Sequence, residues 1–413
     1  MRNKGQQPTS VLTVNGRLRL RRTRWHNADD SVAPADQWLD EAEATVSEGV
    51  REMICRLDQN STSFAATAAN LKRTACLDIS KEQLRQLVEA EGRAVLDQMR
   101  HGELTPEWKA TDCVTDAKTD AKTDAKADAK TTRVYIGCDG VKVPLVTDAE
   151  KQKRRTKVKA KRQRTGKKCR PLPRAKPGSD QPYKEYRLGV LYDEEQKRRY
   201  VSVTRGDHEA TGRMLWNMAE EVGLLEADER IANIDGAPWI RNQIELHGVA
   251  QDIGLDFFHL KDNVQKTRRI VFGEASEAGK TWSDQLLERF HTVGYDDAYD
   301  SLVEWRSPLR GVKRAEANRL LNYVSERREM IHYPEFREKG WQIGSGPTEA
   351  QCKSTTQRVK GRGRRWNADN AESIMALSCL HSSDGWHRHW KNLSANETQP
   401  RHELLPDTCS AGT

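Results

Sequence analysis

The sequence predicts a mixed α/β fold preceded by a mostly helical region. Three observations support this prediction: short β-branched and aromatic segments in the middle of the chain, helical periodicity toward both ends, and the order in which the two patterns alternate. That order is strand, strand, strand, helix, strand, helix, strand, then helices. It is typical of a sheet covered by helical layers. The 413 residues suffice for two or three domains.

Residues 1–110 are predicted to form a helical region after a short basic start. Residues 18–25 alternate apolar and basic side chains, as a short strand does. Apolar residues at helical spacing predict a helix over 36–58, and Ser80 matches the start of a capping box. With a further helix at 63–74, this region fits either a DNA-binding helix-turn-helix or plain helical packing.

Two segments of biased composition interrupt the chain. Residues 115–130 repeat Thr-Asp-Ala-Lys and contain no large apolar residue, so we expect a solvated linker over 111–132. Residues 151–176 contain 14 Lys or Arg residues, and we predict a basic loop over 151–178 rather than a helix or strand.

The predicted α/β domain covers residues 133–385 and is followed by a tail at 386–413. Its elements are strands at 134–138, 186–192, 199–204, 231–234 and 255–258, helices at 207–222, 238–247 and 345–361, and a helical insertion at about 260–335.

Three acidic residues occupy suggestive places in this domain. Asp139 and Asp235 each follow a short apolar strand and precede a glycine, and Glu349 lies in the predicted first turn of a late helix. Carboxylates are the ligands that hard cations such as Mg²⁺ prefer, and a pair of such ions catalyses phosphoryl transfer. An isolated Asp-Gly is usually a surface turn, and an acid in a first turn often only complements the helix dipole. Together the three predict a two-ion site.

Cations and one aromatic follow the third acid. Lys353 lies one helical turn after Glu349, where it is placed either to bind a phosphate or to pair with the glutamate. The candidate DNA-binding residues are Lys353, Lys360, Arg362, Arg364, Arg365 and Trp366. Arg side chains contact phosphates and Trp stacks on unpaired bases, although a solvated loop with Trp366 in the core fits equally well. His259 is expected to have a structural role rather than to bind a metal.

Four segments in this order resemble the DDE transposases of bacterial insertion sequences, of the ISKra type and more weakly the ISLre type. They are residues 135–144, 233–240, 255–259 and 344–349 with 360–367. The resemblance implies a ribonuclease-H-like core and a catalytic triad of Asp139, Asp235 and Glu349. It further implies two Mg²⁺ or Mn²⁺ ions, cleavage and strand transfer at element ends, double-stranded DNA as element end and target, and a homodimer in the synaptic complex. Related chains often carry cysteines near the N-terminus, but Trp25, His26 and Asn27 stand there, so we predict no zinc.

Composition sets the remaining expectations. The net charge of +8 favours a polyanionic partner. No apolar run is long enough for a membrane span, no secretory signal is visible, and none of the 8 cysteines forms a Cys-x-x-Cys pair, so we expect a cytoplasmic protein. Two other functions remain open, a nuclease that does not join strands and an inert DNA-binding protein.

Overall fold

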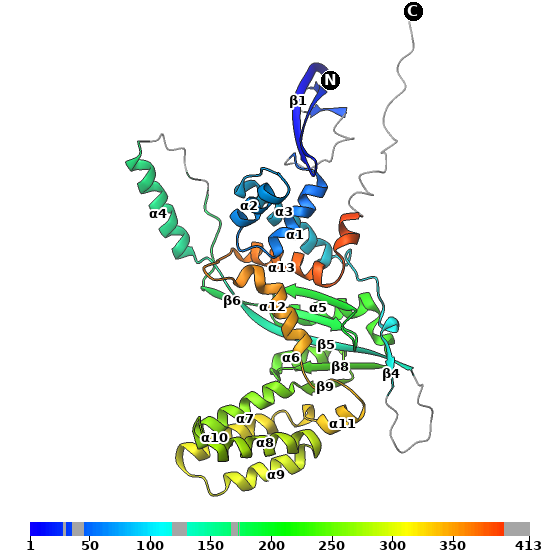
Figure 1. Ribbon diagram of the computed structural model, residues 1–413, viewed down its shortest axis with the longest axis vertical. Helices are drawn as coiled ribbons and strands as arrows, with labels where there is room; N and C mark the ends of the chain where they lie inside the picture. The colour runs from blue at the N-terminus through cyan, green and yellow to red at the C-terminus, as the bar shows by residue number, and fades with distance from the viewer. Residues whose placement is uncertain (28–29, 35–44, 118–129, 167–171, 173, 392–413) are drawn as a thin grey trace, which may run out of the picture.

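A six-stranded mixed sheet lies at the centre of the molecule (Figure 1). The computed structural model describes residues 1–27, 30–34, 45–117, 130–166, 172 and 174–391. The strand order is β7-β6-β5-β8-β9, and β4 pairs with β5 beside this path. The strands are β4 (Val114–Asp116), β5 (Lys130–Pro144), β6 (Tyr183–Tyr192), β7 (Arg199–Thr204), β8 (Glu229–Ile234) and β9 (Asp252–Leu255). β5 pairs antiparallel with β6 and parallel with β8, which confirms the predicted mixed α/β class.

Alternate side chains of β5 supply two separate cores, one on each face of the sheet. Val134, Ile136 and Cys138 are buried against α5 (His208–Val222) and α6 (Pro238–His247). Tyr135, Val141 and Val143 belong to the core on the other face, under α12 (Gly346–Lys360) and α13 (Ala368–Ser382). Because both faces are covered, the strands are apolar almost throughout. The predictions of α5 and α6 are confirmed.

Helix α12 lies directly on β5, and a glycine permits the contact. A Cβ atom at Gly137 would lie 2.9 Å from both Cβ and Cγ2 of Thr348, and closer still to its hydroxyl oxygen. Real side chains do not approach this closely, so only a glycine lets the first turn of α12 rest on the strand. That first turn carries Glu349.

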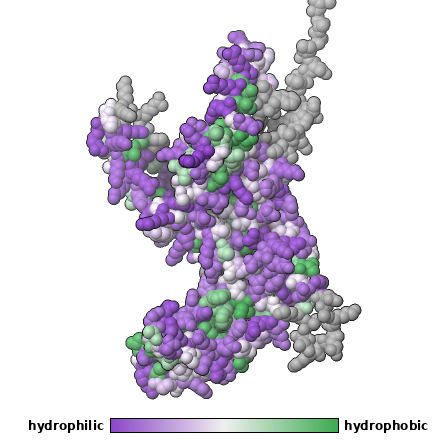
Figure 2. Space-filling model, viewed as in Figure 1, coloured by the Kyte–Doolittle hydropathy of each residue, from purple (hydrophilic) through white to green (hydrophobic). Residues whose placement is uncertain are grey.

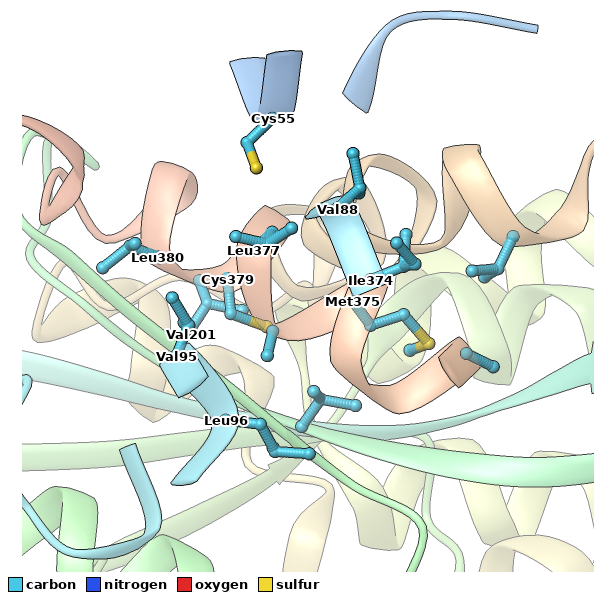
Figure 3. Close-up of a cluster of buried hydrophobic side chains, with 14 of the residues drawn as sticks. Cys55, Val88, Val95, Leu96, Val201, Ile374, Met375, Leu377, Cys379 and Leu380 are labelled. Atoms are coloured by element: carbon cyan, nitrogen blue, oxygen red, sulfur yellow. The ribbon is translucent and has the colours of Figure 1, made fainter. Parts of the chain in front are cut away.

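Helix α13 joins the N-terminal helices to the sheet. Every residue from Ala371 to Leu380 is buried, as expected for a helix covered on all sides. Figure 3 shows its side chains, among them Ile374 and Leu377, between Val88 and Val95 of α3 (Lys81–Arg100) and Val201 of β7. The close approach of α3 and α13 is again made by a glycine, because a Cβ at Gly92 would lie 2.6 Å from the Ser373 carbonyl oxygen.

A buried ion pair connects the N-terminal helices to α12. Arg358 on α12 donates to Asp58 on α1 (Glu48–Gln59) at 2.9 Å, and both side chains are almost completely buried. Thr67 of α2 (Phe64–Thr74) donates to the same carboxylate at 2.8 Å. The guanidinium lies over the rings of Phe64 and Trp366, 4.6 and 5.0 Å from their centroids.

The helices that follow β9 form a separate lobe below the sheet (Figure 1). They are α7 (Phe257–Phe272), α8 (Glu277–Thr292), α9 (Tyr295–Arg306), α10 (Gly311–Ser325) and α11 (Tyr333–Glu338). This confirms the predicted helical insertion. No helix in the described part of the chain has the length and apolar character to cross a bilayer.

We had predicted a helical N-terminal region after a short basic start, but the region also contains a sheet. It begins with a projecting antiparallel sheet of β1 (Arg2–Thr13), β2 (Gly16–His26) and β3 (Ser31–Val32) (Figure 1). The strand expected at 18–25 is therefore present as part of β2. Its partner β1 was not predicted, because that segment was read only as a basic start. The helix predicted over 36–58 begins only at Glu48, because Val46 bridges to Leu12 of β1. Residues 35–44 lie outside the described residues.

Three other boundaries differ from the predictions. The basic segment contains a helix, α4 (Asp148–Arg164), and is not a loop over its whole length. Residues at both ends of the predicted linker belong to β4 and β5, and its repeat at 118–129 lies outside the described residues. The predicted tail begins with Trp386 and Trp390, which are buried, and the Trp386 indole donates to Glu52 of α1 at 3.0 Å. Residues 392–413 are not described.

The helix that starts after Ser80 mainly packs against the core. Ser80 accepts a hydrogen bond from the Gln83 amide at 3.1 Å, which confirms the predicted cap. However, α3 buries eight residues against α1, α2 and α13. Three of its exposed residues are basic and the others are acidic or uncharged: Lys81, Glu82, Gln86, Ala90, Arg93, Ala94, Asp97 and Arg100. The structure therefore favours helical packing over the helix-turn-helix interpretation.

Replacing Gly137 by Ala tests the contact between α12 and β5. We expect Gly137→Ala to lower the free energy of unfolding by about 3 kcal/mol, because the added methyl group forces α12 away from the strand. Thr348→Ala in the same chain should recover part of this loss, as a double-mutant cycle by denaturant unfolding would show. Gly346→Ala is the matched control on α12, because nothing lies within 4 Å of the added carbon. An equal loss in both single variants would contradict the assignment.

Candidate metal centre

The pairing of β5 with β8 brings the two predicted aspartates to the same edge of the sheet. The parallel register runs from Arg133 opposite Glu229 to Ile136 opposite Ala232. The same spacing, continued by three residues, puts Asp139 level with Asp235. Both carboxyls are half-buried, and the charge of Asp235 acts on Asp139. The predicted strand end at 138 is wrong, because β5 continues past Asp139 to Pro144 through its pairing with β6.

Each aspartate accepts a hydrogen bond from a nearby backbone amide through one carboxylate oxygen. Oδ1 of Asp139 accepts from the Gly140 amide at 2.6 Å, and Oδ1 of Asp235 accepts from the Ala237 amide at 2.8 Å. The φ of +81° at Gly236 lets the chain turn away directly after Asp235. These bonds hold the two carboxylates in place before any ligand binds.

The environment of Asp139 disfavours its charge. Burial raises the pKa of this carboxyl most, the hydrogen bond from the Gly140 amide lowers it, and the negative charge of Asp235 raises it again, so that the net shift is upward. A carboxyl whose pKa is raised by burial and by a neighbouring carboxylate is a common feature of cation sites.

Glu349 reaches this edge from α12. Its amide donates to the Ser345 carbonyl at 3.0 Å, and its carboxylate lies 3.5 Å from the ammonium group of Lys353. Helix α12 runs over 346–360, as predicted, but Ser345 does not cap it. Instead the Ser345 hydroxyl and amide both donate to Oδ2 of Asp256.

Two residues outside the predicted triad lie beside Glu349. In the described part of the chain, one group of three potential ligands has all its ligand atoms within 4.8 Å of one another, and it consists of Asp256, His259 and Glu349. Asp139 and Asp235 are not in that group. The expectation that His259 has only a structural role is therefore not supported, because the imidazole belongs to a group able to hold a metal.

The charges of this group are linked to those of the aspartates. Asp256 raises the pKa of His259 through their direct interaction, and the charges of Asp235 and Glu349 act in the same direction. Burial raises the pKa of Asp256, but hydrogen bonds from His259 and Ser345 outweigh it and hold that pKa at about 2. His259 also lowers the pKa of Asp139. The five residues thus form a single electrostatic site.

Asp256 is absent from the predicted site because a strand was predicted through Phe258. In a strand, residues three apart face opposite sides. The structure ends β9 at Leu255, and Asp256 caps α7 by accepting from the His259 amide at 2.9 Å. Helical spacing then puts His259 on the same side as its cap. The available signal was an Asp directly after an apolar strand, with a His at the third position beyond it.

The predicted DNA-binding residues do not form one group. Trp366 is buried and packs edge-on against Phe64 at 5.7 Å, so it is not available to stack on a base. Arg364 donates to the Gln357 and Arg358 carbonyls and so caps the C-terminal end of α12. Arg365 pairs with Glu150 of α4 at 2.9 Å. Lys360 and Arg362 are exposed.

The donor set fits a divalent cation. Asp139, Asp235, Asp256 and Glu349 supply carboxylate oxygens, and His259 supplies a ring nitrogen; hard cations such as Mg²⁺ and Mn²⁺ take the oxygens. Burial, and to a lesser extent the charge of Asp235, raises the pKa of Asp139, so its charged form is unfavourable without a cation. A bound divalent ion would relieve it.

Comparisons with known proteins give little further information. No protein-family model matches the chain, and a search of curated proteins finds no match. Among solved structures, the chain is similar to one titled "Drosophila P element transposase strand transfer complex", with 11% sequence identity and a TM-score of 0.27. That match covers 84% of this chain and 80% of the other. At this TM-score, fold and activity have to be argued from the chain's own residues.

Asparagine at position 139 should stabilise the metal-free protein. Because the pKa of Asp139 is raised, its ionisation opposes folding once the pH exceeds the ordinary value of 3.8. We expect Asp139→Asn to raise the melting temperature by on the order of 1 °C at pH 7. This gain should disappear below about pH 3.8, where the carboxyl is protonated in both the folded and unfolded states.

The same variant should abolish stabilisation by a metal. A ligand that binds only the folded state raises the melting temperature by an amount that grows with ligand concentration relative to its Kd. Millimolar Mn²⁺ should therefore stabilise the wild-type protein and leave Asp139→Asn unchanged in differential scanning calorimetry. Asp284→Asn, which alters an exposed acid on α8, is the control. Equal Mn²⁺ stabilisation of all three proteins would exclude Asp139 as a ligand.

Proposed function

We propose that this chain is a metal-dependent DNA transposase that cleaves DNA strands and transfers them to a new site. The proposal is supported by the strand register that puts Asp139 level with Asp235, and by the joint action of Asp235 and Glu349 on the pKa of His259. The strand order β7-β6-β5-β8-β9 is consistent with the ribonuclease-H-like arrangement that the sequence resemblance implies. The net charge of +8 suits a nucleic-acid substrate.

Asp139, Asp235 and Glu349 are the proposed ligands of two Mg²⁺ or Mn²⁺ ions. When bound, such ions supply Lewis acidity that activates the attacking oxygen and stabilises the leaving oxygen of a phosphoryl transfer. The protein residues supply the positioning. Backbone amides hold the two aspartates, and the packing of α12 on Gly137 sets the place of Glu349.

Asp256 and His259 supplement this site. Asp256 keeps its charge because Ser345 donates two hydrogen bonds to it, and the ionised carboxylate raises the pKa of His259. In its protonated form His259 places a positive charge beside the acids, where a phosphate binds. In its neutral form it is a metal ligand together with Asp256 and Glu349. Metal binding to this group should therefore release a proton.

Two parts of the proposal rest on the sequence resemblance. The DNA partners, element end and target, are both double-stranded, and two copies of the chain are expected to hold two ends together. Cleavage and joining use the same metal site, so a nuclease that only cuts would use the same three acids.

Substitution of the three acids tests the proposed chemistry. Asp139→Asn, Asp235→Asn and Glu349→Gln should each reduce Mn²⁺-dependent nicking of plasmid DNA by at least about 100-fold, because each removes a metal ligand. DNA binding, followed by electrophoretic mobility shift, should change little. Asp284→Asn should retain full nicking. Nicking that survives in any of the three variants would contradict the assignment of that residue.

A joining assay separates the two remaining enzyme functions. Pre-cleaved DNA ends with a free 3′-hydroxyl should become covalently joined to a supercoiled plasmid if the chain is a transposase. Nicking without joined product, at protein concentrations that saturate the ends, would identify the nuclease instead.

A further inference from the structure

Helix α4 projects from the molecule without contributing to either core. It extends over 17 residues between β5 and β6, and none of them is buried. Figure 1 shows the helix pointing away from the sheet, and the surface of this arm is mostly hydrophilic in Figure 2. Most helices in proteins are stabilised by burial of an apolar face, which α4 lacks.

The composition of α4 identifies the chemistry of its partner. The helix contains nine Lys or Arg residues and only two acids, Asp148 and Glu150, both in the first turn. Those acids interact with the helix N-terminus, and Thr147 and Glu150 form a capping box. Beyond the first turn there are only positive charges, which repel one another along the helix. A polyanion would neutralise them.

The cations are arranged on both sides of an uncharged stripe. At 3.6 residues per turn, five uncharged residues share one line along the helix. They are Ala149, Gln152, Thr156, Ala160 and Gln163. Lys153 and Lys157 flank the stripe on one side, and Lys159 and Arg155 flank it on the other. With the stripe toward the floor of a major groove, about 12 Å wide, the cations would face the phosphates of both strands.

The first turn of α4 contacts the segment that follows the C-terminal end of α12, whose first turn carries Glu349. Leu145, which precedes α4, bridges to Trp366, and Glu150 pairs with Arg365. Lys151 donates to the carbonyls of residues 176 and 177 at 3.0 and 2.6 Å. The exposed Lys360 and Arg362 lie in the same connection. Glu349 is eleven residues from Lys360 along α12, or about 17 Å.

We propose that α4 is an arm that binds double-stranded DNA next to the metal site, through phosphate contacts that do not depend on sequence. About 17 Å corresponds to five base pairs at 3.4 Å each, so a duplex held at the metal site reaches the arm within half a helical turn. The arm itself is about 25 Å long and spans seven base pairs. The inference rests on the proposed function for the identity of the polyanion.

The salt dependence of binding by the full-length protein tests the arm. Each phosphate neutralised contributes about 0.9 to the slope of log affinity against log salt concentration. The variant Lys153→Gln/Arg154→Gln/Lys157→Gln/Lys161→Gln should lower the slope for a 30-base-pair duplex by about 3.6, equally for unrelated sequences. Gln163→Ala, which changes the uncharged stripe, should leave the slope unchanged. Hydrogen exchange at α4 should slow on addition of the duplex.

The outcomes separate the arm from the metal site. A wild-type slope in the fourfold variant, or unchanged exchange at α4, would overturn the proposal even if the protein nicks DNA normally. Tighter binding of single-stranded RNA than of duplex DNA of equal length would also overturn it. If the wild-type protein binds DNA with the expected slope but does not nick it with Mn²⁺, the arm stands and the proposed catalysis fails. Far-ultraviolet circular dichroism of the variant verifies that the rest of the chain is folded.

Discussion

The place where α12 rests on β5 determines the geometry of the proposed site. At Gly137 the strand has no side chain, and Thr348 occupies the space that a Cβ would fill. Glu349 is the next residue, so its distance from Asp139 depends on how closely the helix approaches the strand. The positions of the aspartates are determined by the strands that carry or precede them, and β pairing fixes those strands relative to one another. Glu349, in contrast, lies on a helix late in the sequence, and Gly137 allows that helix to pack closely on β5.

The same helix is held at its other end by the N-terminal region. Arg358 is buried between Phe64 and Trp366 and pairs with Asp58, so α1 and α2 help to position α12. Removing one partner of a buried ion pair costs about 3–5 kcal/mol, because it leaves an isolated buried charge. Arg364 satisfies the last carbonyls of α12 from the connection that follows. The region before the linker thus helps to support the helix that carries Glu349.

Local patterns in the sequence predicted the sheet and most of the site. β8 is a short apolar strand that ends just before Asp235, whereas the apolar stretch before Asp139 lies inside the longer β5. Helix α12 begins where its glycines and proline indicate. Local patterns gave wrong predictions where contacts between distant segments determine the structure. Phe257 and Phe258 have β propensity, but Asp256 caps a helix before them and prevents the strand from continuing. Trp366 is surrounded by cations in sequence and is nevertheless buried, because Phe64 and Arg358 come from distant segments. The charge of the basic segment concealed α4, whose capping box was visible at Thr147 and Glu150.

Diffraction from crystals soaked in Mn²⁺ tests the central claim most directly, because the anomalous signal of manganese locates the ions without reference to activity. The account predicts at least one anomalous peak within coordination distance of Asp139, with Asp235 or Glu349 as a further ligand. It also predicts that Asp139→Asn crystals lose that peak. Manganese bound only elsewhere on the molecule, or no bound ion at saturating concentration, would contradict the account.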